Sequence, residues 1–281
     1  SPFGNNTLNN TDKRIFEKLG YDTNGENTII QGDFNKYLDE FKEVKDYNET
    51  NSTNVWAYST TDTASPGVPG VLTYVDDEGN IKNRKVNKKG FEINQKVTKS
   101  FIGALSANNA MNYYLRKEIL DGQTNNRQNP RSDNSTEMEH KWDEAFGYCL
   151  DPTKDDEGED NDILLHKYID ETGKHDVFEQ AFYRGREAII NEDYDKRDRQ
   201  ANIIKELIAD VLIKKAKDYV EHAKEDLNES NSTLTAHIAH DLSEAFGFIY
   251  SLQFIKNIPD KSYTRPIVRF ILAKLTNGNG L

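Results

Sequence analysis

The pattern of apolar and polar residues changes near residue 90. Before it, two β-branched runs, 71–75 and 81–86, flank the polar stretch Asp-Asp-Glu-Gly-Asn. Strand-like runs around an acidic turn that contains Gly predict a small β-hairpin. We also expect two short helices and a polar loop in this part of the chain, at residues 12–19, 34–44 and 48–70.

From Phe91 onward the apolar residues recur with the period of an α-helix. Four of them at i+4 steps predict a first long helix: Ile93, Val97, Phe101 and Leu105. The next helix is expected to begin at Asn134, with Glu137 as its capping-box partner. A wide apolar stripe predicts a long amphipathic helix over 195–227. We expect further helices at 177–190, 233–256 and 266–275, and an acidic loop at 151–162.

These elements predict an all-α protein, a helical bundle preceded by a small mixed segment that holds the hairpin. The expected organisation is an irregular N-terminal segment over 1–90 and a bundle over 91–281, joined in one compact unit.

The bundle contains an internal duplication. The element His-x-x-x-Glu-Ala-Phe-Gly-aromatic occurs at 140–148 and again at 240–248. A long helix with Tyr precedes each copy, and such repeats bury their apolar faces against each other. We predict that residues 91–149 and 203–256 are related helical hairpins.

Composition and charge exclude several classes of protein. The 281 residues carry a net charge of −12, which argues against nucleic-acid binding. No apolar run approaches the length of about 20 residues that a membrane helix needs. The single Cys149 excludes an intramolecular disulfide framework and a cysteine-based zinc cluster. The chain starts with Ser1 and polar residues, which indicates a mature or trimmed product.

With these residues in view, the chain resembles an uncharacterised family of Bacteroidetes cell-envelope lipoproteins, a domain of unknown function related to the imelysins. The stretch from His140 to Tyr148 is the most specific part of this resemblance. The other matching stretches are 24–28, 70–73, 86–92, 99–105 and 181–189.

The resemblance implies an imelysin-like helical fold and export to the periplasm or the outer-membrane surface. It implies a lipid anchor on a Cys upstream of Ser1 in the full-length precursor, so that contact with the membrane is expected only through this removed N-terminal anchor. The imelysins are linked to iron uptake, some were named metallopeptidases, and they carry a Gly-x-His-x-x-Glu motif. Here His140 and Glu144 are four residues apart, as are His240 and Glu244.

The duplicated motif is the candidate metal site. A His and a Glu four residues apart lie on one helix face. If the duplication brings the two copies together, His140, Glu144, His240 and Glu244 offer two imidazoles and two carboxylates, a set that suits Fe, Mn or Zn. The alternative is that each His is hydrogen-bonded to its own Glu and only stabilises the helix face.

Other residues near the motif admit two interpretations. Gly147 and Gly247 provide either close packing of a neighbouring helix or access for a small ligand. Arg186 lies on the apolar stripe of its helix and needs a partner, for which Glu144 or Glu244 is the candidate. His237, three residues before His240, is a further supporting residue for a metal.

Two further motifs are incomplete. Residues Asp22 to Asp33 have the spacing of an EF-hand loop, but Asn27 replaces the usual Gly and position 12 is Asp. The His-Glu-x-x-His motif of metallopeptidases and its inverse are absent from the sequence.

Our leading hypothesis is therefore an exported, surface-anchored binding or accessory protein in metal or iron acquisition, with envelope or outer-membrane proteins as partners. This hypothesis rests on the two helix faces that carry His and Glu and on the resemblance to the imelysin relatives, which is an analogy. The competing hypotheses are a metal-dependent, peptidase-like hydrolase and a purely structural interaction module.

Overall fold

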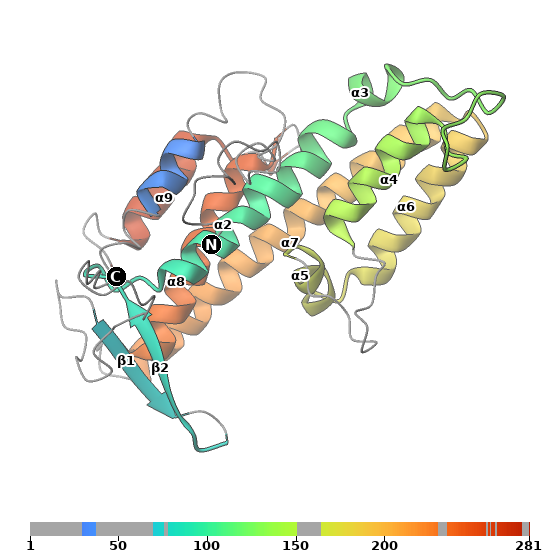
Figure 1. Cartoon of the computed structure of the whole chain (residues 1–281). Helices are drawn as coiled ribbons and strands as arrows, with labels where there is room; N and C mark the ends of the chain where they lie inside the picture. The colour runs from blue at the N-terminus through green and yellow to red at the C-terminus, as the bar shows by residue number, and fades with distance from the viewer. Residues whose placement is uncertain are drawn as a thin grey trace, which may run out of the picture. The chain divides into compact units, whose positions relative to one another are not determined.

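The computed structural model confirms the all-α fold with one small β-hairpin (Figure 1). It describes the following residues: 30–37, 70–75, 78–150, 164–229, 235–256, 258, 260, 261, 263–276 and 281. Several expectations lie outside them, namely the helix at 12–19, the loop at 48–69, the later part of 34–44 and the acidic loop at 151–162. Residues 30–37 are helical.

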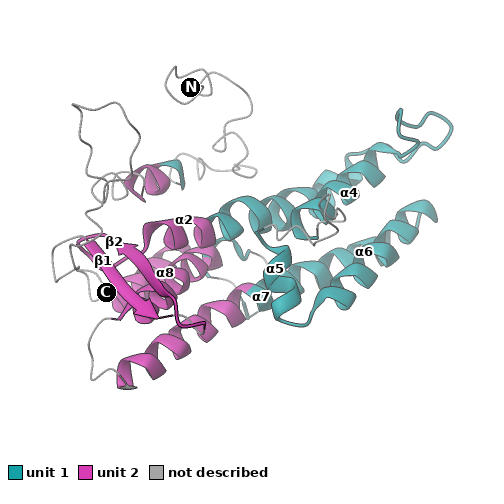
Figure 2. Cartoon of the chain, turned by 60° about the horizontal axis from the view of Figure 1, so that its bottom comes forward, with its two compact units in different colours: residues 1–31, 101–211, 253–263 teal, residues 32–100, 212–252, 264–281 magenta. Residues whose placement is uncertain are grey.

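The chain divides into two compact units, each built from several separate segments (Figure 2). Unit 1 consists of residues 1–31, 101–211 and 253–263, and unit 2 consists of residues 32–100, 212–252 and 264–281. Each unit holds one copy of the duplicated motif.

Unit 1 is built around α4 (Glu137–Cys149), which contacts α6 (His175–Ile190) and a short turn, η4 (Ala110–Tyr114). Met138, Trp142, Ala145 and Cys149 of α4 are all buried, and their spacing of three and four residues places them on one helix face. The other elements of the unit are α3 (Lys117–Asp121), α5 (His166–Glu171), η3 (Ile102–Ala107), η5 (Leu252–Phe254) and the first half of α7 (Tyr194–Glu229).

Unit 2 is built around α8 (Ala236–Ser251), which packs against α9 (Arg265–Leu275) and the hairpin. The hairpin strands β1 (Gly70–Val75) and β2 (Ile81–Val86) are antiparallel and pair Gly70 with Val86. The unit also contains α2 (Ile93–Phe101), the second half of α7 and the helical residues 32–37. Since α8 is buried on most sides, its side chains are mainly apolar and small.

The first long helix differs from the expected one because it contains two π-helical stretches, η3 and η4. Within α2 the buried residues are Ile93, Lys96 and Ser100, whereas Val97 and Phe101, which precede the first π-helical stretch, are only half-buried, as is Leu105. A π-helical turn holds more residues than an α-turn, so the buried face shifts again from Ile102 onward. The start of α4 also differs: Thr136, not Asn134, is the N-cap, and Glu139, not Glu137, completes the capping box.

Within the described residues, the structure contains no helix that is both long enough and apolar enough to cross a membrane.

Candidate functional site

The first copy of the motif lies on the face of α4 opposite its buried residues. Nε2 of His140 lies 3.3 Å from Oε1 of Glu144, one helical turn away, and both side chains are partly exposed. The sequence places His140 and Glu144 on the outer face of α4, because the apolar residues Trp142 and Ala145 occupy the buried face of the same helix. Here the structure brings one predicted pair together.

A cavity of about 450 Å³ opens on this face. Among the described residues, those that line it are His140, Asp143, Glu144, Gly147 and Tyr148. The hollow is wide open to solvent, and its volume is in the range of pockets that hold small organic ligands. The lining is acidic and aromatic, so the cavity favours a ligand that carries a positive charge and an apolar stem.

Two tyrosines form the aromatic part of this region. The rings of Tyr114 and Tyr148 stack with centroids 5.5 Å apart. Burial and the nearby Glu144 carboxylate, to which the Tyr114 hydroxyl donates a hydrogen bond, raise the pKa of Tyr114. Burial, together with Glu144, also raises the pKa of Tyr148. Both hydroxyls therefore stay protonated at neutral pH, and that of Tyr114 donates to Glu144.

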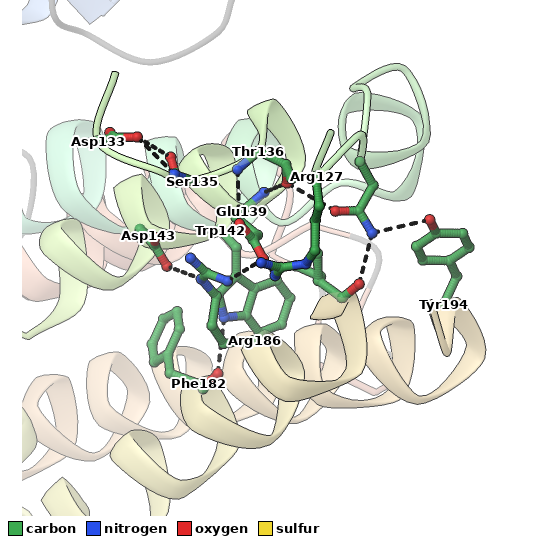
Figure 3. A network of polar contacts seen from close by, with 12 residues as sticks. Arg127, Asp133, Ser135, Thr136, Glu139, Trp142, Asp143, Phe182, Arg186 and Tyr194 are labelled. Carbon is green, nitrogen blue, oxygen red and sulfur yellow. Dashed lines mark hydrogen bonds and ion pairs between the residues drawn. The ribbon is translucent and has the colours of Figure 1, made fainter. Parts of the chain in front are cut away.

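Arg186 belongs to an ion-pair network on the neighbouring face of α4 (Figure 3). It contacts Glu139 at 2.7 Å and Asp143 at 2.9 Å, so its partners are not the expected Glu144 or Glu244. Glu139 is 1% exposed, also pairs with Arg127, and accepts a hydrogen bond from the backbone of Thr136. This network neutralises a buried carboxylate at the start of a helix, which is a structural role.

Beside this network, Trp142 fixes the packing of α4 on α6. Its indole Nε1 donates a hydrogen bond to the carbonyl of Phe182 (Figure 3). Gly185 faces the indole ring so closely that an added Cβ would overlap it. The sequence Phe-Tyr-Arg-Gly-Arg on α6 therefore combines one close contact, at Gly185, with one ion-pairing arginine, Arg186.

The second copy of the motif, on α8, has different surroundings. Nδ1 of His240 lies 2.8 Å from Glu92 and its Nε2 lies 3.4 Å from Glu244. Glu244 also pairs with Lys99 at 3.2 Å, and Glu92 with Arg84 at 3.4 Å. Each carboxylate faces a different ring nitrogen, and a cation already accompanies each one, so this copy forms an ion-pair network.

The two glycines of the motif show the same difference. A Cβ on Gly247 would overlap Lys99 and lie 2.9 Å from the carbonyl oxygen of Lys96, so α2 packs directly on this glycine. A Cβ on Gly147 would meet no described atom within 4 Å. Close packing thus explains Gly247, whereas Gly147 lines the cavity.

The remaining candidates have other contacts. The ring of His237 packs edge-on against Tyr74 of the hairpin, with centroids 4.8 Å apart. Asp33, the last position of the EF-hand-like spacing, accepts a hydrogen bond from Tyr250 and pairs with Arg265. The other positions of that spacing, Asp22 to Thr28, lie outside the described residues.

His140 and Glu144 belong to unit 1, and His240 and Glu244 belong to unit 2. The expectation that all four gather at one metal stays a prediction. The sequence analysis missed Asp143 as a site residue, although it lies three residues after His140 and hence on a neighbouring part of the helix face. It also passed over the spacing His-x₃-Asp-x₄-His at 166–175, which brings three side chains of metal-ligand type together.

Comparison with known families and proteins adds one finding. A family model described as "Domain of unknown function (DUF4856)" matches residues 2–281. No curated protein and no solved structure matches the chain.

Proposed function

Because the chain belongs to the DUF4856 family of domains of unknown function, we propose its function from the site: a binding or accessory protein that holds a positively charged ligand in the α4 cavity. The observation that carries this proposal is the cavity of about 450 Å³ with Asp143, Glu144, His140 and Tyr148 around it.

The second copy of the motif supports the sign of the ligand's charge. In α8 the equivalent carboxylate, Glu244, pairs with the ammonium group of Lys99 at 3.2 Å. In α4, Asp143 pairs with Arg186, while the groups near Glu144 are His140 and the hydroxyls of Tyr114 and Tyr148. A ligand ammonium or guanidinium group would take the place at Glu144 that Lys99 takes at Glu244.

The wider proposal includes an exported, lipid-anchored location, envelope partners and a role in metal or iron acquisition. The support for these parts is the resemblance to the imelysin relatives, so they are argued by analogy.

The test is a titration of the purified chain with agmatine, which carries an ammonium and a guanidinium group, monitored by NMR or calorimetry. We expect saturable binding that Glu144→Gln weakens at least about tenfold, because a charge-assisted hydrogen bond contributes about 1.5–3 kcal/mol. Glu225→Gln changes an exposed carboxylate on α7 and serves as the matched control. Equal binding of the anionic probe glutarate, or binding that is indifferent to Glu144→Gln, would contradict the proposal.

A further inference from the structure

Helix α5 begins with a buried histidine that has no hydrogen-bond partner in the described part of the chain. His166 is 4% exposed, and neither of its ring nitrogens has a hydrogen-bond partner among the described residues. A buried imidazole normally satisfies both nitrogens, because an unpaired polar group loses its contacts with water without compensation. The position of His166 therefore calls for a ligand to one of these nitrogens.

Asp170 and His175 lie beside this imidazole. Asp170 is four residues after His166 on α5, and its Oδ2 lies 3.4 Å from Nε2 of His166. Its other oxygen, Oδ1, lies 2.7 Å from Nδ1 of His175, the first residue of α6. The two imidazole rings are 5.4 Å apart between centroids and are inclined at 45°.

The local sequence explains how these three side chains meet. α5 ends at Glu171 with Thr172 as its C-cap, and the next residue, Gly173, has a φ of +66°, in the left-handed region that favours glycine. The backbone N–H of Lys174 then donates to the carbonyl of Ile169, which reverses the chain. The turn brings His175 back beside Asp170, and no long-range contact is needed for this placement.

We propose that His166, Asp170 and His175 form a binding site for a divalent transition-metal ion. One ligand atom from each side chain lies within 4.8 Å of the other two, so small side-chain rotations bring all three around one ion. The site lies within unit 1 and shares no residue with the α4 cavity, so it does not rest on the function proposed for that cavity.

The donor set selects the class of metal. Two imidazole nitrogens and one carboxylate oxygen suit Zn²⁺, Fe²⁺, Co²⁺ or Ni²⁺, whereas Mg²⁺ and Ca²⁺ prefer oxygen ligands. Asp170 and His175 are partly exposed, with side-chain exposures of 42% and 41%. An ion held by three protein ligands on this open side keeps a coordination position for water or for a ligand from solution.

An ion-pair cluster is the other interpretation of the same contacts. It accounts for His175, whose nitrogen lies at hydrogen-bond distance from Asp170. It does not account for His166, because 3.4 Å with no hydrogen-bond geometry leaves both buried nitrogens unsatisfied. A metal ion on Nε2 satisfies His166 and uses the same carboxylate.

The experiment uses the full chain without a histidine tag, stripped of metal with a chelator that is then removed. Zn²⁺ is titrated by calorimetry, and Co²⁺ is titrated by visible absorption, whose ligand-field bands report imidazole coordination. We expect one ion per chain. His175→Ala should weaken binding more than about 100-fold, since even residues that only orient a metal ligand contribute about 10–100-fold.

Matched variants separate this site from other histidines and carboxylates. Asp170→Asn should weaken binding as His175→Ala does, and both substitutions change partly exposed side chains. The controls His222→Ala and Asp176→Asn, both at exposed positions, should bind like the wild type. The proposal is overturned if the wild type shows no saturable binding, or if His175→Ala and Asp170→Asn both leave the affinity unchanged.

Discussion

His140 and His240 have the same spacing to a glutamate but different neighbours. The carboxylate beside His140, that of Glu144, is 38% exposed. Solvent therefore screens the His140–Glu144 pair, and its contribution to stability is small, about 0–1 kcal/mol. Around His240 the two carboxylates are 5% and 9% exposed and each has a cationic partner. The same motif therefore lines a cavity in one unit and forms a buried network in the other.

The buried network predicts acid sensitivity through Glu92. Burial raises the pKa of this carboxyl, whereas the hydrogen bond to His240 and the charge of Arg84 lower it. The lowering effects together outweigh burial, so the pKa of Glu92 lies below its usual 4.5. A carboxyl with a lowered pKa stabilises the fold above its unfolded pKa, and this contribution is lost as the pH falls through the folded value. We expect the wild type to lose stability below about pH 4.5 more steeply than Glu92→Gln. Urea unfolding between pH 6 and pH 3 measures this.

The control for Glu92 is Glu225→Gln, an exposed substitution in the same unit that should follow the wild-type curve. Parallel acid limbs for wild type and Glu92→Gln would show that Glu92 carries no such linkage.

Helix packing decides what the two motif glycines do. α8 is buried on most sides and α2 packs on Gly247, whereas α4 exposes Gly147 to the cavity. Glycine costs a helix about 1 kcal/mol relative to alanine, so it persists where a neighbour needs the space. Of the two motif glycines, only Gly247 has a neighbour among the described residues that occupies the space of a Cβ.

This difference predicts opposite effects of one substitution. Gly247→Ala should destabilise the protein by about 1–3 kcal/mol, because the new Cβ overlaps the backbone and Cβ of α2. Gly147→Ala should be neutral or stabilise the protein by up to about 1 kcal/mol, because it gains helix propensity. Chemical denaturation of the two variants side by side tests this. A similar loss in both would mean that Gly147 is also closely packed.

In the chain as a whole, the net charge of −12 is spread over two units that each hold one copy of the motif. The hypothesis of one shared metal site needs residues of both units. The His166 site needs residues of unit 1 alone.

A double variant separates these two hypotheses. We expect Zn²⁺ to raise the melting temperature of His140→Ala/His240→Ala as much as that of the wild type, because an ion that binds only the native state at His166, Asp170 and His175 still stabilises it. Differential scanning calorimetry with and without Zn²⁺ provides the measurement. If the double variant loses the shift while His175→Ala keeps it, the metal is bound by the duplicated motif instead.

The sequence by itself determined the longer helices, the hairpin and the face of α4 that carries His140 and Glu144, but not the short helices α3 and α5. Periodicity and turn residues are local, so they can be read without a fold. It also held the signal for the His166 site, in a spacing of four and five residues across Gly173. Tertiary structure alone decided that Arg186 pairs with Glu139, that α2 covers Gly247, and that the first helix buries Lys96 and Ser100 in place of Val97 and Phe101. These features depend on which neighbour fills each space, and side-chain spacing along one helix carries no information about the helix that packs against it.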